Sequence, residues 1–179
     1  NAGFEKIEDY KDMPALNEYQ HQKDIGGNIR QFIEELKFSS RDNGRTPMQW
    51  DSTANAGFTT GTPWISTNSN YKNINAAASE QDPASCLNYF RKMIALRKSN
   101  EILVYGKYTL LDKNNTDVYA YTRELNGKKF LVLLNFKNKA ATVNSGIDLN
   151  KSRILISNYK NASVNGTLQP YEATIFEVL

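Results

Sequence analysis

The sequence predicts an α+β fold in which helices and a long loop are followed by a small antiparallel β-sandwich. Up to roughly residue 100, apolar residues recur at the helical period of about 3.6. From about Glu101 onward the period changes to two, which is typical of β-strands. Within the first part, residues 40–75 are rich in glycine, proline, asparagine and threonine, the composition of a loop. We therefore divide the chain into residues 1–100 and 101–179.

Two helices are expected near the start of the chain. The first covers residues 12–22, and the second covers residues 29–36, where apolar residues repeat at i, i+3, i+4 and i+7. Gly26 and Gly27 separate them, because glycine is a poor helix former.

A third helix is expected from residue 82 to about residue 98. Asp82 is expected at the N-cap and Pro83 at the first helical position, an arrangement typical of helix starts. Its apolar residues are expected to form a core stripe, which comprises Leu87, Phe90, Met93 and Ile94. Cys86 is interpreted as a small buried residue rather than a nucleophile, since only one histidine, His21, could activate it.

Five strands are expected after residue 101, in runs rich in β-branched and aromatic residues. They cover residues 105–111, 117–124, 128–136, 153–159 and 171–178. Asn126 and Gly127 predict a two-residue hairpin, because both tolerate the positive φ of a type I′ turn. Residues 128–136 are apolar on both faces, which indicates a central strand. About eighty residues of this pattern suit a small sandwich of two packed sheets.

Composition narrows the possible partners. A net charge of +3 without a basic run predicts no nucleic-acid or anionic-membrane partner. No apolar run approaches the roughly 18 residues of a transmembrane helix. One histidine and one cysteine cannot build a metal cluster, so we expect no metal and no cofactor.

The polar chemistry concentrates in one loop, residues 40–51. It combines guanidinium, carboxylate, amide and indole groups, and the candidate binding residues are Arg41, Asp42, Asn43, Arg45 and Trp50. Arginine offers a fixed fork of donors, Asp and Asn exchange hydrogen bonds with hydroxyls, and Trp offers a flat face to a sugar ring. The loop therefore predicts sugar binding. The alternative is an Ω-loop whose arginines and aspartates pair internally.

The motif Arg-Asp-Asn-x-Arg-Thr-Pro-Met-Gln-Trp-Asp, at residues 41–51, resembles the signature of oligo-1,6-glucosidase-like members of the α-amylase superfamily. The resemblance continues through further short motifs, at residues 55–58, 63–64, 70–75, 94–97 and 168–176. It implies that residues 1–100 are the C-terminal segment of a catalytic (β/α)8 barrel and that residues 101–179 are the β-sandwich domain behind it. A complete barrel needs roughly 250 residues. The catalytic carboxylates are therefore expected outside this chain, in a missing N-terminal barrel.

The resemblance also implies roles for the loop residues. Arg41 matches an arginine that reaches the sugar at the cleavage subsite. Arg45 matches the second arginine, which we expect to brace the loop through Asp51 or the sheet. Asp42 and Asn43 could contact sugar or could form turns with their own backbone. Trp50, like Trp64, could stack on sugar or hold the loop down.

These expectations describe part of a retaining α-glucosidase acting on α-linked gluco-oligosaccharides, with a binding loop and a supporting β-domain but no catalysis by this chain alone. Related parent activities stay open: trehalose-phosphate hydrolase, dextran glucosidase and sucrose isomerase. The resemblance favours a cytoplasmic enzyme, and the compartment is otherwise open. A different class is a self-standing carbohydrate-binding or interaction module, with Tyr119 and Tyr121 on one strand face and Tyr105 and Tyr108 nearby.

Overall fold

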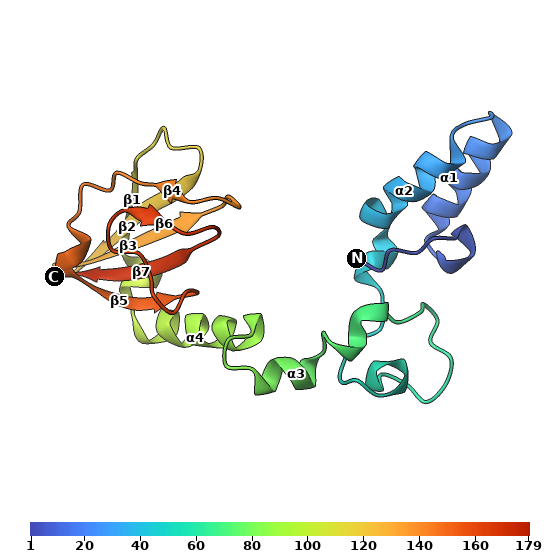
Figure 1. The fold of residues 1–179 in the computed structure, drawn as a ribbon, viewed down its shortest axis with the longest axis horizontal. Coiled ribbons are helices and arrows are strands. Elements are labelled where there is room, and N and C mark those ends of the chain that lie inside the picture. Colours follow the sequence, from blue (N-terminus) through green and yellow to red (C-terminus); the bar gives the residue numbers. More distant parts are fainter. The chain divides into compact units, whose positions relative to one another are not determined.

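The computed structural model describes residues 1–179 and separates into two compact units, Asn1–Ser85 and Cys86–Leu179. Figure 1 shows the first two helices of the first unit in blue and the sheet of the second in yellow to red. Helix α4 (Cys86–Ser99) belongs with the sheet, because its Met93 and Leu96 pack against the sheet core. The expected domain limits, at residues 100 and 101, remain a prediction.

The first unit is built on two antiparallel helices, α1 (Met13–Asp24) and α2 (Ile29–Ser39). Both expected helices are confirmed, and each extends beyond its predicted end. Gly26 has a φ of +70° in the turn between them, which suits glycine. The main core cluster of this unit is small and consists of Ile7, Tyr10, Ala15 and Leu36, and Ala56 and Ile65 are buried separately in the loop. The shorter helices are η1 (Ile7–Asp9), η2 (Arg41–Gly44), η3 (Ala54–Gly57), η4 (Ser69–Lys72) and α3 (Ala76–Gln81).

The expected start of the third helix is wrong. Asp82 follows α3 as its C-cap, and α4 begins only at Cys86. The Asp82 carboxylate accepts a hydrogen bond from the backbone N–H of Ala84 at 2.8 Å and so forms a local turn. Aspartate bonds nearby backbone in turns as readily as at caps, so sequence alone could not separate the two.

The expected core stripe of α4 is wrong in part. Phe90 is 63% exposed, and Cys86 is exposed at the first position of the helix instead of buried. Met93 and Leu96 do pack on the sheet core. Only the later half of α4 therefore supplies core residues, whereas the spacing of its apolar residues predicted a buried face along the whole helix.

The second unit is a five-stranded antiparallel sheet in the order β1-β2-β3-β7-β5. All five expected strands are confirmed as β1 (Lys107–Leu111), β2 (Val118–Leu125), β3 (Lys128–Asn135), β5 (Ser152–Ser157) and β7 (Ala173–Val178). The predicted central strand is β3. The second sheet of the expected sandwich is formed by β4 (Ala141–Thr142) and β6 (Thr167–Leu168), two strands that were not predicted because two residues are too short to show a period. Helices α5 (Ile102–Tyr105) and η5 (Leu149–Lys151) complete the unit.

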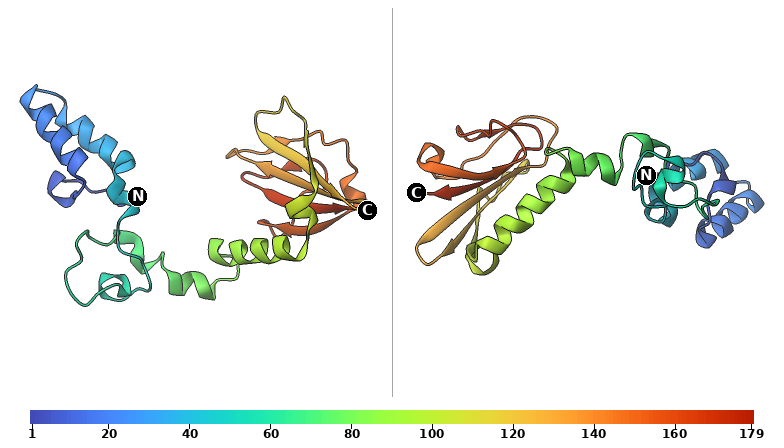
Figure 2. Two further views of the ribbon diagram at one scale, coloured as in Figure 1. Left: turned by 180° about the vertical axis from the view of Figure 1, so that it is seen from behind. Right: turned by 90° about the horizontal axis from the view of Figure 1, so that it is seen from below.

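Both faces of the large sheet are covered. Leu131 and Leu133 of β3 face a core that includes Ala141 of β4 and Leu168 of β6. On the opposite face, Phe130 and Val132 share a core with α5, and α4 packs against it. Figure 2 shows the large sheet from two further sides, with α4 in light green. The predicted alternation of the central strand thus places one set of side chains in each core.

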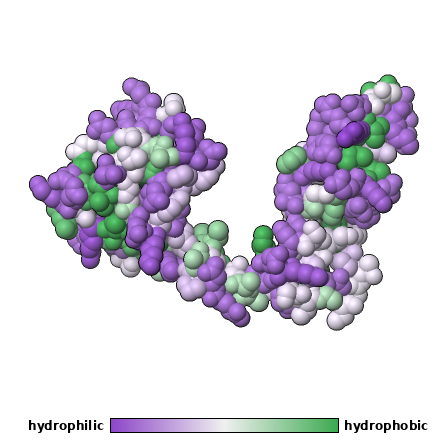
Figure 3. Space-filling model, in the orientation of Figure 1, coloured by the Kyte–Doolittle hydropathy of each residue, from purple (hydrophilic) through white to green (hydrophobic).

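The hairpin expected between β2 and β3 is confirmed. Asn126 and Gly127 have φ values of 51° and 76°, as a type I′ turn requires. The antiparallel register pairs Leu125 with Lys128 next to this turn. No closed barrel is present in the chain, and none of its helices is long and apolar enough to cross a membrane. Figure 3 shows apolar side chains among hydrophilic ones on the surfaces of both units.

Candidate functional site

The candidate sugar-binding loop starts directly after α2, in the short helix η2. Ser40 caps this turn, because its hydroxyl accepts a hydrogen bond from the backbone N–H of Asp42 at 3.2 Å. The tight turn sends neighbouring side chains in opposite directions: the side chain of Asp42 is 0% exposed and that of Arg41 is 64% exposed. The sequence placed both residues in one site, and the structure gives them different environments.

Asp42 is the buried anchor of the loop. Its Oδ2 atom accepts hydrogen bonds from the backbone N–H groups of Lys11 at 2.7 Å and of Asp12 at 3.0 Å. Its Oδ1 atom accepts from Arg45 Nε at 3.1 Å and from Arg45 Nη2. A buried carboxylate needs such a full set of donors. Asp42 thereby ties the segment before α1 to the loop.

Arg45 braces the loop, but not through the expected partner. It pairs with Asp42, three residues earlier, rather than with Asp51 or the sheet. Its guanidinium also lies 5.2 Å from the ring centroid of Trp64, within cation–π range. Asp51 instead accepts hydrogen bonds from Thr53, which hold the pKa of the Asp51 carboxyl below its ordinary value. Because η2 is a tight helical turn, it places Arg45 beside Asp42, three residues earlier, and not beside Asp51.

Arg41 pairs with a residue that the motif does not contain, Asp12. The Oδ1 atom of Asp12 accepts from Arg41 Nε at 3.0 Å and from Nη2 at 2.5 Å, and its Oδ2 atom accepts from the Arg41 backbone N–H at 3.3 Å. The side-chain hydrogen bond from Arg41 is the main cause that lowers the pKa of Asp12, and the same bond raises the pKa of Arg41. Asp12 was missed because it lies 29 residues earlier, and no local pattern marks it as a partner.

Asn43 uses both ends of its amide within the protein. Its Nδ2 donates to the carbonyl of Lys37 at 3.1 Å, and its Oδ1 accepts from the backbone N–H of Ala2 at 3.0 Å. Trp50 is different, because the residue is 53% exposed while its backbone N–H is fixed by a hydrogen bond to the Ala56 carbonyl at 2.9 Å. Trp50 therefore presents an open ring from a rigid main chain.

The rest of the loop is held by its own backbone. Asn55 and Ala56 have positive φ values of 51° and 58°, which L-residues adopt rarely. The Asn55 amide donates to the carbonyls of Thr59 at 3.1 Å and Gly61 at 2.9 Å, which pins this part of the loop. Internal pairing thus accounts for Asp42, Asn43 and Arg45, whereas part of Arg41 and the Trp50 ring stay open.

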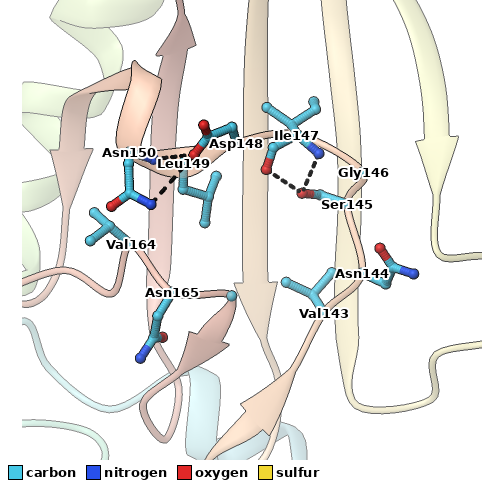
Figure 4. A pocket seen from close by; sticks show the side chains of 11 residues that line it. Val143, Asn144, Ser145, Gly146, Ile147, Asp148, Leu149, Asn150, Val164 and Asn165 are labelled. Carbon is cyan, nitrogen blue, oxygen red and sulfur yellow. Dashed lines mark hydrogen bonds between the residues drawn. The ribbon is translucent and has the colours of Figure 1, made fainter.

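A cavity of about 360 Å³ lies in the second unit (Figure 4). It is lined by the segments 143–150 and 164–166. Two of its polar side chains are already engaged locally: Asp148 accepts from the backbone of Asn150 at 3.1 Å, and Asn165 accepts from Ser163 at 2.7 Å. No aromatic or charged donor group lines it, so it is a poorer sugar site than the loop.

Of the four tyrosines considered for a binding module, Tyr108, Tyr119 and Tyr121 gather on one face of the sheet, whereas Tyr105 ends helix α5. The hydroxyls of Tyr108 and Tyr119 lie 2.8 Å apart, and this hydrogen bond raises the pKa of Tyr108 to about 12. The ring of Tyr121 lies 5.3 Å from each of the other two, with interplanar angles of 40° and 46°. The rings are tilted and do not form the flat platform that a sugar-stacking surface requires.

Two known family models match this chain, one in each part. Residues 8–106, more than half of the chain, match the family described as the alpha amylase catalytic domain. Residues 118–175 match the alpha-amylase SusG C-terminal domain. The chain therefore belongs to the α-amylase family, and it consists of a fragment of the catalytic domain followed by a C-terminal domain.

Individual relatives narrow this assignment. The chain is 42% identical to an oligo-1,6-glucosidase of Bacillus cereus over 99% of its own length and 33% of that enzyme. The crystal structure of a trehalose-6-phosphate hydrolase from Bacillus licheniformis superposes with a TM-score of 0.90 at 38% identity, over 99% of this chain and 33% of that one. A trehalulose synthase, MutB, superposes with a TM-score of 0.84 at 36% identity, over 98% and 33%. The resemblance inferred from residues 41–51 is confirmed, and the chain spans about a third of the length of these relatives.

Proposed function

We propose that this chain is the C-terminal portion of an α-glucosidase that acts on α-linked gluco-oligosaccharides. The similarity to an oligo-1,6-glucosidase over almost the whole chain supports this activity. The groups that break the bond would come from the part of the catalytic domain outside these 179 residues. The chain itself would contribute a sugar-binding loop and a supporting β-domain.

The substrate contact that we propose is made by Arg41. The single observation that carries it is the 64% exposure of the Arg41 side chain, in a loop where Asp42, Asn43 and Arg45 are all bonded within the protein. Trp50 is the second proposed contact, because its open ring can stack on the C–H face of a pyranose. We assign Asp42, Asn43 and Arg45 to holding the loop in shape.

In a retaining glucosidase one carboxylate attacks the anomeric carbon while a second carboxyl protonates the leaving oxygen, and water then hydrolyses the glycosyl–enzyme intermediate. Arg41 takes no part in these bond changes. Its charged donors would hold sugar hydroxyls in place while the bond is cleaved, and a fixed charge in a partly dry subsite lowers the barrier by preorganisation.

The test compares the enzyme that contains both this chain and the rest of the barrel with the 179-residue chain alone. We expect the complete enzyme to release glucose from isomaltose, and the chain alone to release none, because positioning cannot replace a missing nucleophile and acid. Assays on trehalose 6-phosphate and sucrose identify the other parent activities that the relatives suggest. Turnover by the purified chain alone, abolished by Arg41→Ala, would overturn the proposal.

The runner-up is a self-standing carbohydrate-binding module that uses Tyr108, Tyr119 and Tyr121. Their clustering on one sheet face favours it, and their tilted rings disfavour it. Affinity electrophoresis of the chain in gels containing a soluble α-glucan distinguishes the two. Retardation that Tyr119→Ala removes and Arg41→Ala leaves unchanged would select the module.

A further inference from the structure

The buried carboxylate of Asp12 holds Arg41 at two points. One point is the side chain, where Oδ1 bonds to Nε and Nη2, and the other is the main chain, where Oδ2 accepts from the Arg41 N–H at 3.3 Å. The side chain of Asp12 is only 6% exposed, so solvent screens this pair less than an ordinary surface ion pair. The position of the arginine therefore depends on this carboxylate.

Only one edge of the Arg41 guanidinium is used by the protein. Nε and Nη2 share a single oxygen of Asp12, and Nη1 has no hydrogen-bond partner in the chain. A guanidinium is planar, so fixing the Nε edge also fixes the direction of the outer edge formed by Nη1 and Nη2. The outer edge is left with free N–H donors in a set orientation.

Asp12 is itself held from two sides. Its backbone N–H donates to the buried Asp42 at 3.0 Å, and its carbonyl accepts from Leu16 in the first turn of α1 at 3.0 Å. Asp42 is in turn paired with Arg45. The loop motif and the start of α1 are thus joined in three steps: Arg45 pairs with Asp42, Asp42 accepts from the Asp12 backbone, and the Asp12 carboxylate pairs with Arg41.

We propose that Asp12 is a positioning residue for sugar binding, which orients the guanidinium of Arg41 so that its outer edge meets the hydroxyls of a pyranose. This inference rests on the proposed function and adds a residue outside the loop motif. Asp12 touches no sugar itself. It acts through Arg41 alone, and this property separates it from a residue that merely stabilises the fold.

The first test is a double-mutant cycle in the complete enzyme. Asp12→Asn removes the charge and keeps the shape, and we expect kcat/KM to fall roughly tenfold because the guanidinium loses its fixed direction. In an Arg41→Ala background the same change should have no further effect on kcat/KM. The matched control is Glu177→Gln, which removes the carboxylate charge from the pair of exposed Arg153 with the less exposed Glu177 in the β-domain. Glu177→Gln should lower the melting temperature about as much as Asp12→Asn does, and it should leave kcat/KM unchanged.

Each outcome of the cycle is informative. A loss from Asp12→Asn that persists in the Arg41→Ala background would overturn the positioning role. An unchanged kcat/KM for Asp12→Asn, beside an impaired Arg41→Ala, would overturn it as well and leave the proposed function standing. An Arg41→Ala enzyme with full activity would overturn the proposed function itself.

A second measurement needs no variant and so does not depend on how Asp12→Asn folds. Nitrogen-15 NMR of the 179-residue chain reports the exchange of the Nε proton of each arginine with water. We expect exchange at Arg41 to be roughly tenfold slower than at the exposed Arg30 of α2, whose side chain makes no hydrogen bond, because a proton held by a carboxylate must first be released. Equal exchange rates at the two arginines would overturn the inference.

Discussion

At the residue scale, the loop separates two kinds of arginine. Arg41 is paired with the buried carboxylate of Asp12 on one edge of its guanidinium and leaves the other edge unpaired. Arg45 lies between Asp42 and the Trp64 ring. One guanidinium thus faces outward with unpaired donors, and the other holds the loop in shape. The two arginines should respond differently to substitution.

We expect Arg41→Ala in the complete enzyme to lower kcat/KM roughly thirtyfold to a thousandfold, because a charge-assisted hydrogen bond in the subsite is lost. Arg41→Lys should not restore activity, since a point charge cannot pair with Asp12 and present a second edge at once. Arg41→Ala should also lower the melting temperature, because the buried Asp12 carboxylate loses its side-chain donors, whereas Arg41→Lys should change it little. Steady-state kinetics with thermal unfolding checks this, and an active Lys variant would contradict it.

Asp42→Asn is expected to destabilise the first unit by about 3–5 kcal/mol, because it removes one partner of a buried, fully hydrogen-bonded ion pair. Arg45→Ala should be destabilising for the same reason, since it leaves the Asp42 carboxylate short of donors. Denaturant unfolding measures both. A stable Arg45→Ala variant with lost activity would show that Arg45 contacts substrate and does not brace the loop.

At the element scale, the β2–β3 hairpin is the clearest case of local sequence deciding structure. We expect Gly127→Val to lower the stability of the second unit by about 1–3 kcal/mol, because a β-branched residue is strained at a φ of +76°. The matched control is Gly127→Asn, because asparagine tolerates the positive φ of a type I′ turn. The denaturation midpoints of the two variants give the comparison, and an equal loss would show that strain at this φ is not the cause.

At the scale of the whole molecule, the two units differ in how they are stabilised. The second has a continuous five-stranded hydrogen-bonded ladder with a core on each face. The first has a small core and exposes large apolar side chains, among them Phe38 at 80% and Trp64 at 65%. Regions with few buried contacts open more readily.

Limited proteolysis of the 179-residue chain should therefore cut first within residues 46–71, and later within β2, β3 and β7. Mass spectrometry of the early fragments identifies the sites. Initial cleavage inside residues 128–159 would reverse the order of stability that we assign to the two units.

The repeating pattern of the chain determined most of the fold. The five strands, the central place of β3, the type I′ turn at Asn126 and Gly127, and helices α1 and α2 follow from periodicity and turn chemistry, which act over a few residues. The motif at residues 41–51 likewise indicated the family. Strands as short as β4 and β6 could not be predicted, because two residues are too few to show a periodic pattern.

Only the tertiary structure decided which side chain does what. Asp12 meets Arg41 across 29 residues, Arg45 turns back to Asp42 instead of Asp51, and Phe90 leaves the core although it lies on an apolar stripe. Such pairings depend on how elements far apart in the chain pack, and on which charges burial forces together. The sequence names the chemical groups of the loop, and packing assigns each of them to bracing the fold or to facing outward.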